Sequence, residues 1–222
     1  MASFDKTKAK KQIKSIFEKY SSLKLKHKSL SSTDGKLYEL YVLSRLLKEL
    51  VKRGFKVSLN GHSIKFQASP GHISPGDSHF DVRIKGQSSA KFKIYTNVEV
   101  RTLGSALTGT SQACGHHELD IVVVHAGATG KPTFSDVVLG IECKAQGRFK
   151  KSMIREVLGL RREIAYLQPS QASVLSQYQT KKKVAVPAEP PSELWLAFTD
   201  SKGLNYGYSP KAFGIELKHW QP

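Results

Sequence analysis

Two apolar runs joined by a short, turn-rich segment dominate the middle of this sequence. "HHELDIVVVH" (116–125) and "SDVVLGIECKA" (135–145) flank "AGATGKP", which has the glycine and proline content of a turn. Strands joined by so short a connection pair in antiparallel fashion. The sequence therefore predicts a buried β-hairpin, and a fold for this chain has to build its sheet around that hairpin.

The second of these strands ends in opposite charges. Side chains alternate between the two faces of an extended strand, so Glu142 and Lys144 share one face and Cys143 lies on the other. A suitable register would bring Asp120, at the head of the first apolar run, to the same edge as Glu142. The two charges are then either an ordinary ion pair at a strand end or half of an active site.

The first half of the chain predicts helices followed by strands. Residues 1–28 hold nine lysines against Asp5 and Glu18, with apolar residues at helical spacing, which indicates a basic N-terminal helix. A second helix is expected at about 36–53, and alternating apolar residues between 55 and 101 predict several strands.

The second half predicts a helix from about 152 to 167 and a buried strand at 194–199. Between them, residues 168–193 are rich in Gln, Ser, Lys and Pro, which favours an irregular or flexible excursion. This order of elements is an α/β (α+β) pattern. At 222 residues the chain suits one compact domain, taken as 29–222.

Charge and composition restrict the partners. The chain has 35 Lys and Arg against 18 Asp and Glu, a net charge of +17 that attracts polyanions and above all nucleic acid. An anionic membrane surface is the weaker alternative, and no apolar run approaches the roughly 18 residues of a membrane span. Two cysteines and the absence of a signal-peptide pattern lead us to expect a cytoplasmic location.

A further carboxylate faces inward on the second predicted helix. Glu39 is followed at steps of four, seven and eleven residues by Leu43, Leu46 and Leu50. A carboxylate on such a buried stripe needs a partner, unless it lies at the solvated rim of the first turns. Asp81 or Glu99 could take its place, although Glu99 and Arg101 on one strand face also make an ion pair.

Asp120, Glu142 and Glu39 together would place three carboxylates at one point. Such like charges repel unless a cation lies between them, and all-oxygen ligands suit Mg²⁺ or Mn²⁺ better than zinc. A zinc alternative built on Cys114, His116 and His117 has no second ligand pair at zinc-finger spacing.

The helix with Glu39, the strand with Asp120, the following strand with Glu142-Cys143-Lys144 and then a helix resemble the PD-(D/E)XK nuclease superfamily. The resemblance covers roughly residues 36–199. It implies a restriction-endonuclease-like core, with a mixed central sheet flanked by helices and a strand-rich insertion before Asp120. It also implies Mg²⁺- or Mn²⁺-dependent hydrolysis of phosphodiester bonds in DNA.

The resemblance also implies roles for individual residues. Asp120 and Glu142 would bind the metal with the main-chain carbonyl of Cys143, Lys144 would be the catalytic lysine, and Glu39 the auxiliary acid. Leu119 stands where the motif has proline. Four cations at the entry of the next helix would contact phosphate: Arg148, Lys150, Lys151 and Arg155.

The resemblance further implies a DNA endonuclease in a restriction or defence setting, with a homodimer as the expected assembly. The alternatives are a non-catalytic nucleic-acid-binding protein or an assembly subunit that retains a nuclease-like fold.

Overall fold

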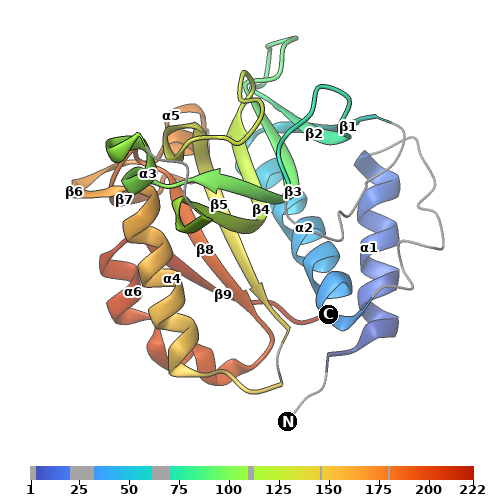
Figure 1. Cartoon of the computed structure of the whole chain (residues 1–222). Coiled ribbons are helices and arrows are strands. Elements are labelled where there is room, and N and C mark those ends of the chain that lie inside the picture. The colour runs from blue at the N-terminus through green and yellow to red at the C-terminus, as the bar shows by residue number, and fades with distance from the viewer. Residues whose placement is uncertain (1–3, 21–32, 62–70, 110–112, 146, 180) are drawn as a thin grey trace.

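The computed structural model describes residues 4–20, 33–61, 71–109, 113–145, 147–179 and 181–222. These ranges form a mixed α/β structure with a seven-stranded central sheet flanked by helices (Figure 1). The helices are α1 (Lys6–Tyr20), α2 (Asp34–Lys52), α3 (Leu103–Thr108), α4 (Lys151–Ile164), α5 (Val174–Tyr178) and α6 (Tyr208–Ala212). Short 3-10 turns are η2 (Ala113–Gly115), η3 (Phe134–Asp136) and η4 (Ser201–Tyr206).

The strands of the central sheet run in the order β1-β2-β3-β4-β5-β8-β9. They are β1 (Lys56–Asn60), β2 (His79–Arg83), β3 (Phe92–Arg101), β4 (His116–His125), β5 (Val137–Lys144), β8 (Glu193–Phe198) and β9 (Ile215–His219). Neighbours from β1 to β5 pair antiparallel, whereas β5, β8 and β9 pair in parallel. The predicted hairpin is thus formed by β4 and β5.

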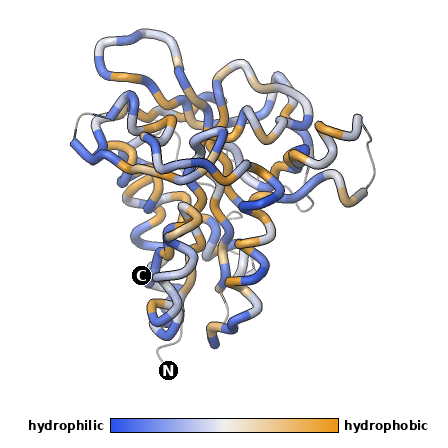
Figure 2. The backbone as a smooth tube through the Cα atoms, turned by 90° about the vertical axis from the view of Figure 1, so that its left-hand side faces the viewer, coloured by the Kyte–Doolittle hydropathy of each residue, from blue (hydrophilic) through white to orange (hydrophobic). Residues whose placement is uncertain are grey.

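Different helices cover the two faces of the sheet (Figure 1). The face toward α1 and α2 packs around Leu40, Leu43 and Leu47 of α2, and the face toward α4 packs around Val157 and Leu160. Figure 2 shows apolar and hydrophilic residues alternating along the helices, as two amphipathic layers around a sheet require. No helix in the described ranges combines the length and the apolar character needed to cross a lipid bilayer.

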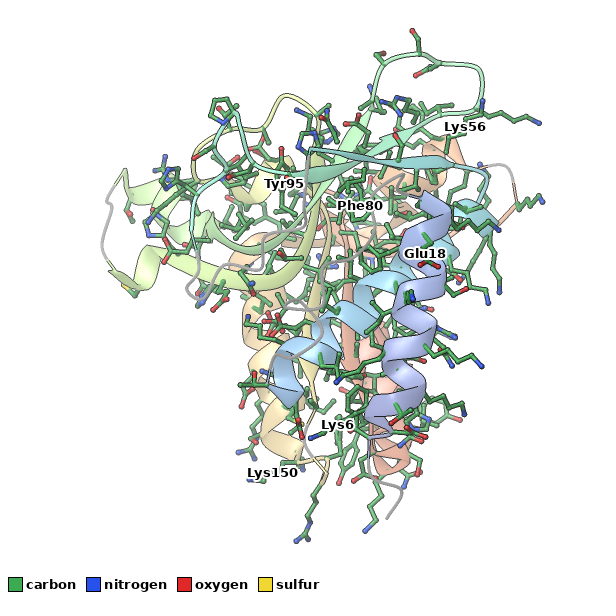
Figure 3. The ribbon with its side chains drawn as sticks, turned by 90° about the vertical axis from the view of Figure 1, so that its right-hand side faces the viewer. Lys6, Glu18, Lys56, Phe80, Tyr95 and Lys150 are labelled. Carbon is green, nitrogen blue, oxygen red and sulfur yellow. The ribbon has the colours of Figure 1, made fainter. Side chains whose placement is uncertain are left out.

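Helix α1 lies within the segment predicted as a basic N-terminal helix. Ala9, Ile13 and Phe17 are buried against the rest of the molecule, and the Phe17 ring lies 5.7 Å from that of Phe80. The remaining surface of the helix carries lysines toward solvent. In Figure 3, α1 lies on the outside of the molecule, with Lys6 at the same end as Lys150.

Residues 168–193 contain more regular structure than their composition predicts. Strands β6 (Tyr166–Ala172) and β7 (Ala185–Glu189) pair antiparallel, and α5 lies between them. This small sheet buries only Ala165, Val186 and Ala188 as a separate cluster. Its exposed β6 strand has no apolar alternation, so the sequence pattern predicts an irregular segment there. The predicted strand at 63–68 lies outside the described residues.

Candidate active site

One break in strand geometry passes through two neighbouring strands. In β3, Ile94 packs toward α2 but Val98 packs toward α4, although both positions have the same parity. In β4, Ile121 and Leu119 show the same reversal. Between Ile94 and Val98 on β3, Asn97 adopts a left-handed backbone with φ of 53°, a conformation that asparagine tolerates better than most residues. The pleat therefore changes phase beside Asp120, because the β3–β4 register passes from Thr96↔Ile121 to Val98↔Leu119 and leaves Asn97 and Asp120 between these pairs.

The β4–β5 ladder ends at the same place. Ile121 pairs with Ile141, but no pairing continues beyond them toward Glu142. Instead, Oδ2 of Asp120 accepts a hydrogen bond of 2.6 Å from the backbone N–H of Cys143. The side chain of Asp120 thus bridges the two strands where their backbones separate. This contact brings Asp120 to the part of β5 that carries the charged residues.

Glu142 and Lys144 form a loose ion pair on the α4 side of β5. Nζ of Lys144 lies 3.5 Å from Oε2 of Glu142 and 3.5 Å from Oε2 of Glu156 on α4. Burial, and then the charge of Asp120, raise the pKa of Glu142 to about 8. Burial disfavours the Lys144 ammonium, but the charges of Glu142 and Glu156 outweigh it and raise the Lys144 pKa. Lys144 is therefore a cation at neutral pH.

Glu39 has a partner on its own helix. Nζ of Lys36 lies 2.9 Å from Oε2 of Glu39 and 2.8 Å from Oδ1 of Asn97, so it ties the first turn of α2 to the break in β3. Burial raises the pKa of Glu39 to about 7, the hydrogen bond from Lys36 opposes this, and the charge of Asp120 adds to it. Glu39 therefore belongs to the same electrostatic group as Asp120.

An open cleft of about 450 Å³ borders this group between the sheet and α4. Its charged lining residues include Glu118, Glu142, Lys144, Arg155, Glu156 and Glu163. Burial, followed by the charge of Asp120, raises the pKa of Glu118. Four carboxyl groups, those of Glu39, Glu118, Asp120 and Glu142, thus all have raised pKa values near one another. Burial is the main cause in each case, and the charge of Asp120 adds to it for the other three. A bound cation would stabilise the ionised forms of these carboxyl groups.

The donor set suits a hard divalent cation. Within the described ranges no three His, Cys, Asp or Glu side chains form a group that could hold a metal, and this applies also to Cys114, His116 and His117. Mg²⁺, however, commonly binds through one or two carboxylates while keeping several waters. Asp120 and Glu142 supply such a pair, whereas Glu39 is held by Lys36.

The other acidic candidates have cations of their own. Asp81 lies 2.6 Å from Arg83 and 3.3 Å from His79 on β2. Glu99 pairs with Lys131 at 2.5 Å, not with Arg101 as its strand position suggests. Glu99 does act electrostatically on Glu118, so its charge reaches the edge of the site while Asp81 is engaged elsewhere.

The basic residues predicted for phosphate contact lie after the charged strand. Arg148, Lys150, Lys151 and Arg155 are exposed, and Lys150 immediately precedes α4. Of these four, Arg155 lines the cleft. Lys150 lies at the end of the molecule at which Lys6 is also labelled in Figure 3.

Sequence patterns alone missed Lys36, Asn97 and Glu156. Asn97 lies 61 residues from Lys36, so no periodicity links them. Glu156 faces Lys144 from α4, one helical turn after the basic run, and only the packing of α4 on β5 selects it. A polar asparagine within a strand of alternating apolar residues was the available signal.

Comparison of the chain with protein-family models, with curated proteins and with solved structures finds no match.

Proposed function

We propose that this protein is a divalent-metal-dependent nuclease that hydrolyses phosphodiester bonds in DNA. The observation that carries the proposal is the contact between Asp120 and Cys143, which gathers Asp120, Glu142 and Lys144 at the point where β4 and β5 separate. The resemblance of the same residues to the PD-(D/E)XK superfamily supports it. The order of the main elements also supports it: α2, then the antiparallel strands β3, β4 and β5, then α4 and the parallel strand β8.

Each residue has a distinct part in the proposed reaction. Asp120 and Glu142, with the main-chain carbonyl of Cys143, would hold Mg²⁺ or Mn²⁺, and Glu39 would act as the auxiliary acid. When bound, the metal would supply an activated water and neutralise charge on the phosphate. Lys144, kept charged by its acidic neighbours, is suited to hold the scissile phosphate electrostatically rather than to accept a proton.

The charge of the chain supports nucleic acid as the substrate. The net charge is +17, and exposed cations lie on α1 and at the entry of α4. Contacts to phosphate from Arg148, Lys150, Lys151 and Arg155 would position the backbone without reading its sequence. A restriction or defence setting, a cytoplasmic location and a homodimer are further proposals that rest on the family resemblance and composition.

Cleavage of supercoiled plasmid tests the proposal. We expect nicking or linearisation with Mg²⁺ or Mn²⁺, none with EDTA, and none with Asp120→Asn or Lys144→Ala. Glu189→Gln is the matched control, because Glu189 is an exposed carboxylate on β7. Metal-independent binding of DNA without cleavage by the wild type would instead favour a non-catalytic nucleic-acid-binding protein.

A further inference from the structure

Large apolar side chains are exposed in one short segment that the proposed active site does not use. Between β8 and β9, Leu204, Tyr206, Tyr208 and Phe213 expose 52%, 40%, 93% and 38% of their surface. Single exposed apolar residues are ordinary, but four within ten residues mark a surface that another molecule covers. Tyr208, which is 93% exposed, buries almost none of its surface within the protein.

This segment is fixed to the basic loop that follows β5. The backbone N–H of Phe149 donates to Oδ2 of Asp200 at 2.8 Å, and the Phe149 ring stacks on Tyr206 at 5.6 Å. Gly203 is pressed so closely against Phe149 that a Cβ there would lie 2.8 Å from the ring. Phe149 therefore connects the basic loop that holds Arg148 and Lys150 to the exposed ring of Tyr206.

The same surface begins beside the candidate catalytic lysine. Lys144 is paired with Phe198 in the β5–β8 ladder, and the Phe198 ring lies 4.8 Å from that of Phe149. Phe149 in turn stacks on Tyr206, two residues before Tyr208 in the sequence. The segment lies on the same side of the sheet as α4 (Figure 1).

Cations lie beside the exposed side chains. Leu204 and Tyr208 border a cavity of about 630 Å³ together with Lys182, Lys183 and Lys211. The acidic residues there have partners: Glu193 binds the buried Arg53 at 2.9 Å, and Glu216 binds Lys218 at 2.6 Å. Lys182 lies 3.4 Å from Glu49, and Lys183 donates to the carbonyls of Ser176 and Gln179, so the exposed Lys211 is the cation left beside the rings. An exposed ammonium group beside exposed rings fits a ligand that combines phosphates with flat, apolar faces.

We propose that this surface, defined as Leu204, Tyr206 and Tyr208 with Lys211 and the loop at 148–150, binds the unpaired bases and backbone of a single-stranded nucleic acid segment. Stacked base pairs in a duplex hide their faces, whereas unpaired bases can stack on tyrosine. The inference rests on the proposed function and narrows its substrate to DNA with a single-stranded part, such as a fork, flap or overhang.

Binding in EDTA tests the inference independently of cleavage. Fluorescence anisotropy would measure the affinity of the full chain for a forked oligonucleotide, a single strand and a blunt duplex of equal length. We expect Tyr208→Ala to weaken fork and single-strand binding by about tenfold, in line with the loss of one stacked base, and to change duplex binding less than about twofold. Tyr208→Phe, which keeps the ring, should bind like the wild type.

Controls separate stacking from charge and from misfolding. Leu107→Ala removes an apolar side chain that is 68% exposed on α3 and should leave all three affinities unchanged. Equal weakening on duplex and fork, or no weakening by Tyr208→Ala, would overturn the inference, and the second result would point to a protein partner for this surface. If the wild type binds forks selectively but does not cleave DNA, the result would contradict the proposed function and leave this inference standing.

Discussion

Asp120 accepts a 2.6 Å hydrogen bond from the backbone N–H of Cys143, just beyond the last pair of the β4–β5 ladder. An acidic side chain thus replaces a backbone acceptor where two buried strands part. The bond favours the ionised form of Asp120, while burial opposes it more strongly and raises its pKa. Asp120 is therefore both a structural bridge and the residue whose charge acts on Glu142 and Glu39.

Replacing Asp120 by asparagine should separate its structural role as a bridge from its electrostatic role. The amide oxygen can still accept the Cys143 N–H, so we expect a folded protein, but it carries no charge for a metal. Metal-dependent cleavage should fall by at least about a hundredfold, as for loss of one preorganised electrostatic group. Plasmid relaxation and circular dichroism would be measured on the same sample. Wild-type activity in the folded variant would contradict the role of Asp120.

The raised pKa of Glu142 makes stability depend on pH without metal. A carboxyl group with a pKa of about 8 when folded, against an ordinary value of 4.5, binds more protons in the folded state between those pH values. Its contribution to stability is then present at acidic pH and is lost as pH rises toward 8 and above.

Urea denaturation at several pH values in EDTA would show this effect. From pH 5 to pH 9 the wild type should lose more than about 1 kcal/mol relative to Glu142→Gln, which cannot ionise. Added Mg²⁺ should reduce the loss, because it binds the ionised form. Identical pH profiles for the two proteins would contradict the buried, raised-pKa state of Glu142.

Lys36 should compete with a metal for Glu39. Lys36→Met removes the ammonium that Glu39 binds at 2.9 Å, and we expect destabilisation of about 1 kcal/mol in EDTA. Saturating Mg²⁺ should narrow the difference, since a divalent cation can then neutralise the carboxylate cluster. Lys14→Met is the matched control, because Lys14 meets Glu18 only at 4.0 Å in an exposed pair. A penalty that is the same with and without Mg²⁺ would mean that Lys36 acts only as a structural tie.

The basic loop should contribute to DNA affinity through salt-sensitive contacts. Lys150→Gln with Lys151→Gln removes two exposed cations before and at the start of α4. The slope of log affinity against log salt for a duplex should fall by about two, close to one per lost phosphate contact. Lys85→Gln, exposed after β2, should leave the slope unchanged. An unaltered slope in the double variant would remove this loop from the DNA surface.

A buried ion pair links the end of α2 to the start of β8. Arg53 and Glu193 are 0% and 1% exposed, and their side chains meet at 2.9 Å. Glu193→Gln leaves the Arg53 charge in the core, and thermal or chemical unfolding should show a loss of about 3 kcal/mol or more. Glu189→Gln on the exposed face of β7 should cost little. A loss below about 1 kcal/mol would show that Glu49, which lies 3.4 Å from Nε of Arg53, compensates its charge instead.

The hairpin and its charged end could be predicted from sequence because they are local. The predicted strand at 116–125 has the bounds of β4. Alternation in β5 predicts that Glu142 and Lys144 share one face, and the fold turns that face toward α4. Mixed α/β architecture with helices on both faces also follows from the order of periodic segments. These features depend on residues close together in the chain.

Long-range contacts supplied the rest of the site. Periodicity placed Glu39 inward, but only the fold shows that Lys36 holds it and that Asn97 holds Lys36. The phase change at Asn97 breaks the period on which strand prediction depends, so the alternation gave no account of how Asp120 reaches Cys143. Likewise, the four exposed side chains between β8 and β9 become one surface only when Phe149 packs against Tyr206.

Asn97 also affects how easily the backbone hydrogen bonds at the centre of the sheet open. Asn97 is fully buried, and its left-handed backbone interrupts the regular pairing of β3. An interrupted ladder of backbone hydrogen bonds opens at a lower free energy than a continuous one. Amide hydrogen exchange should therefore find a fast-exchanging point in the interior, flanked by slow strands. Binding of a cation or substrate at that point would register as added protection in the middle of the protein rather than at its rim.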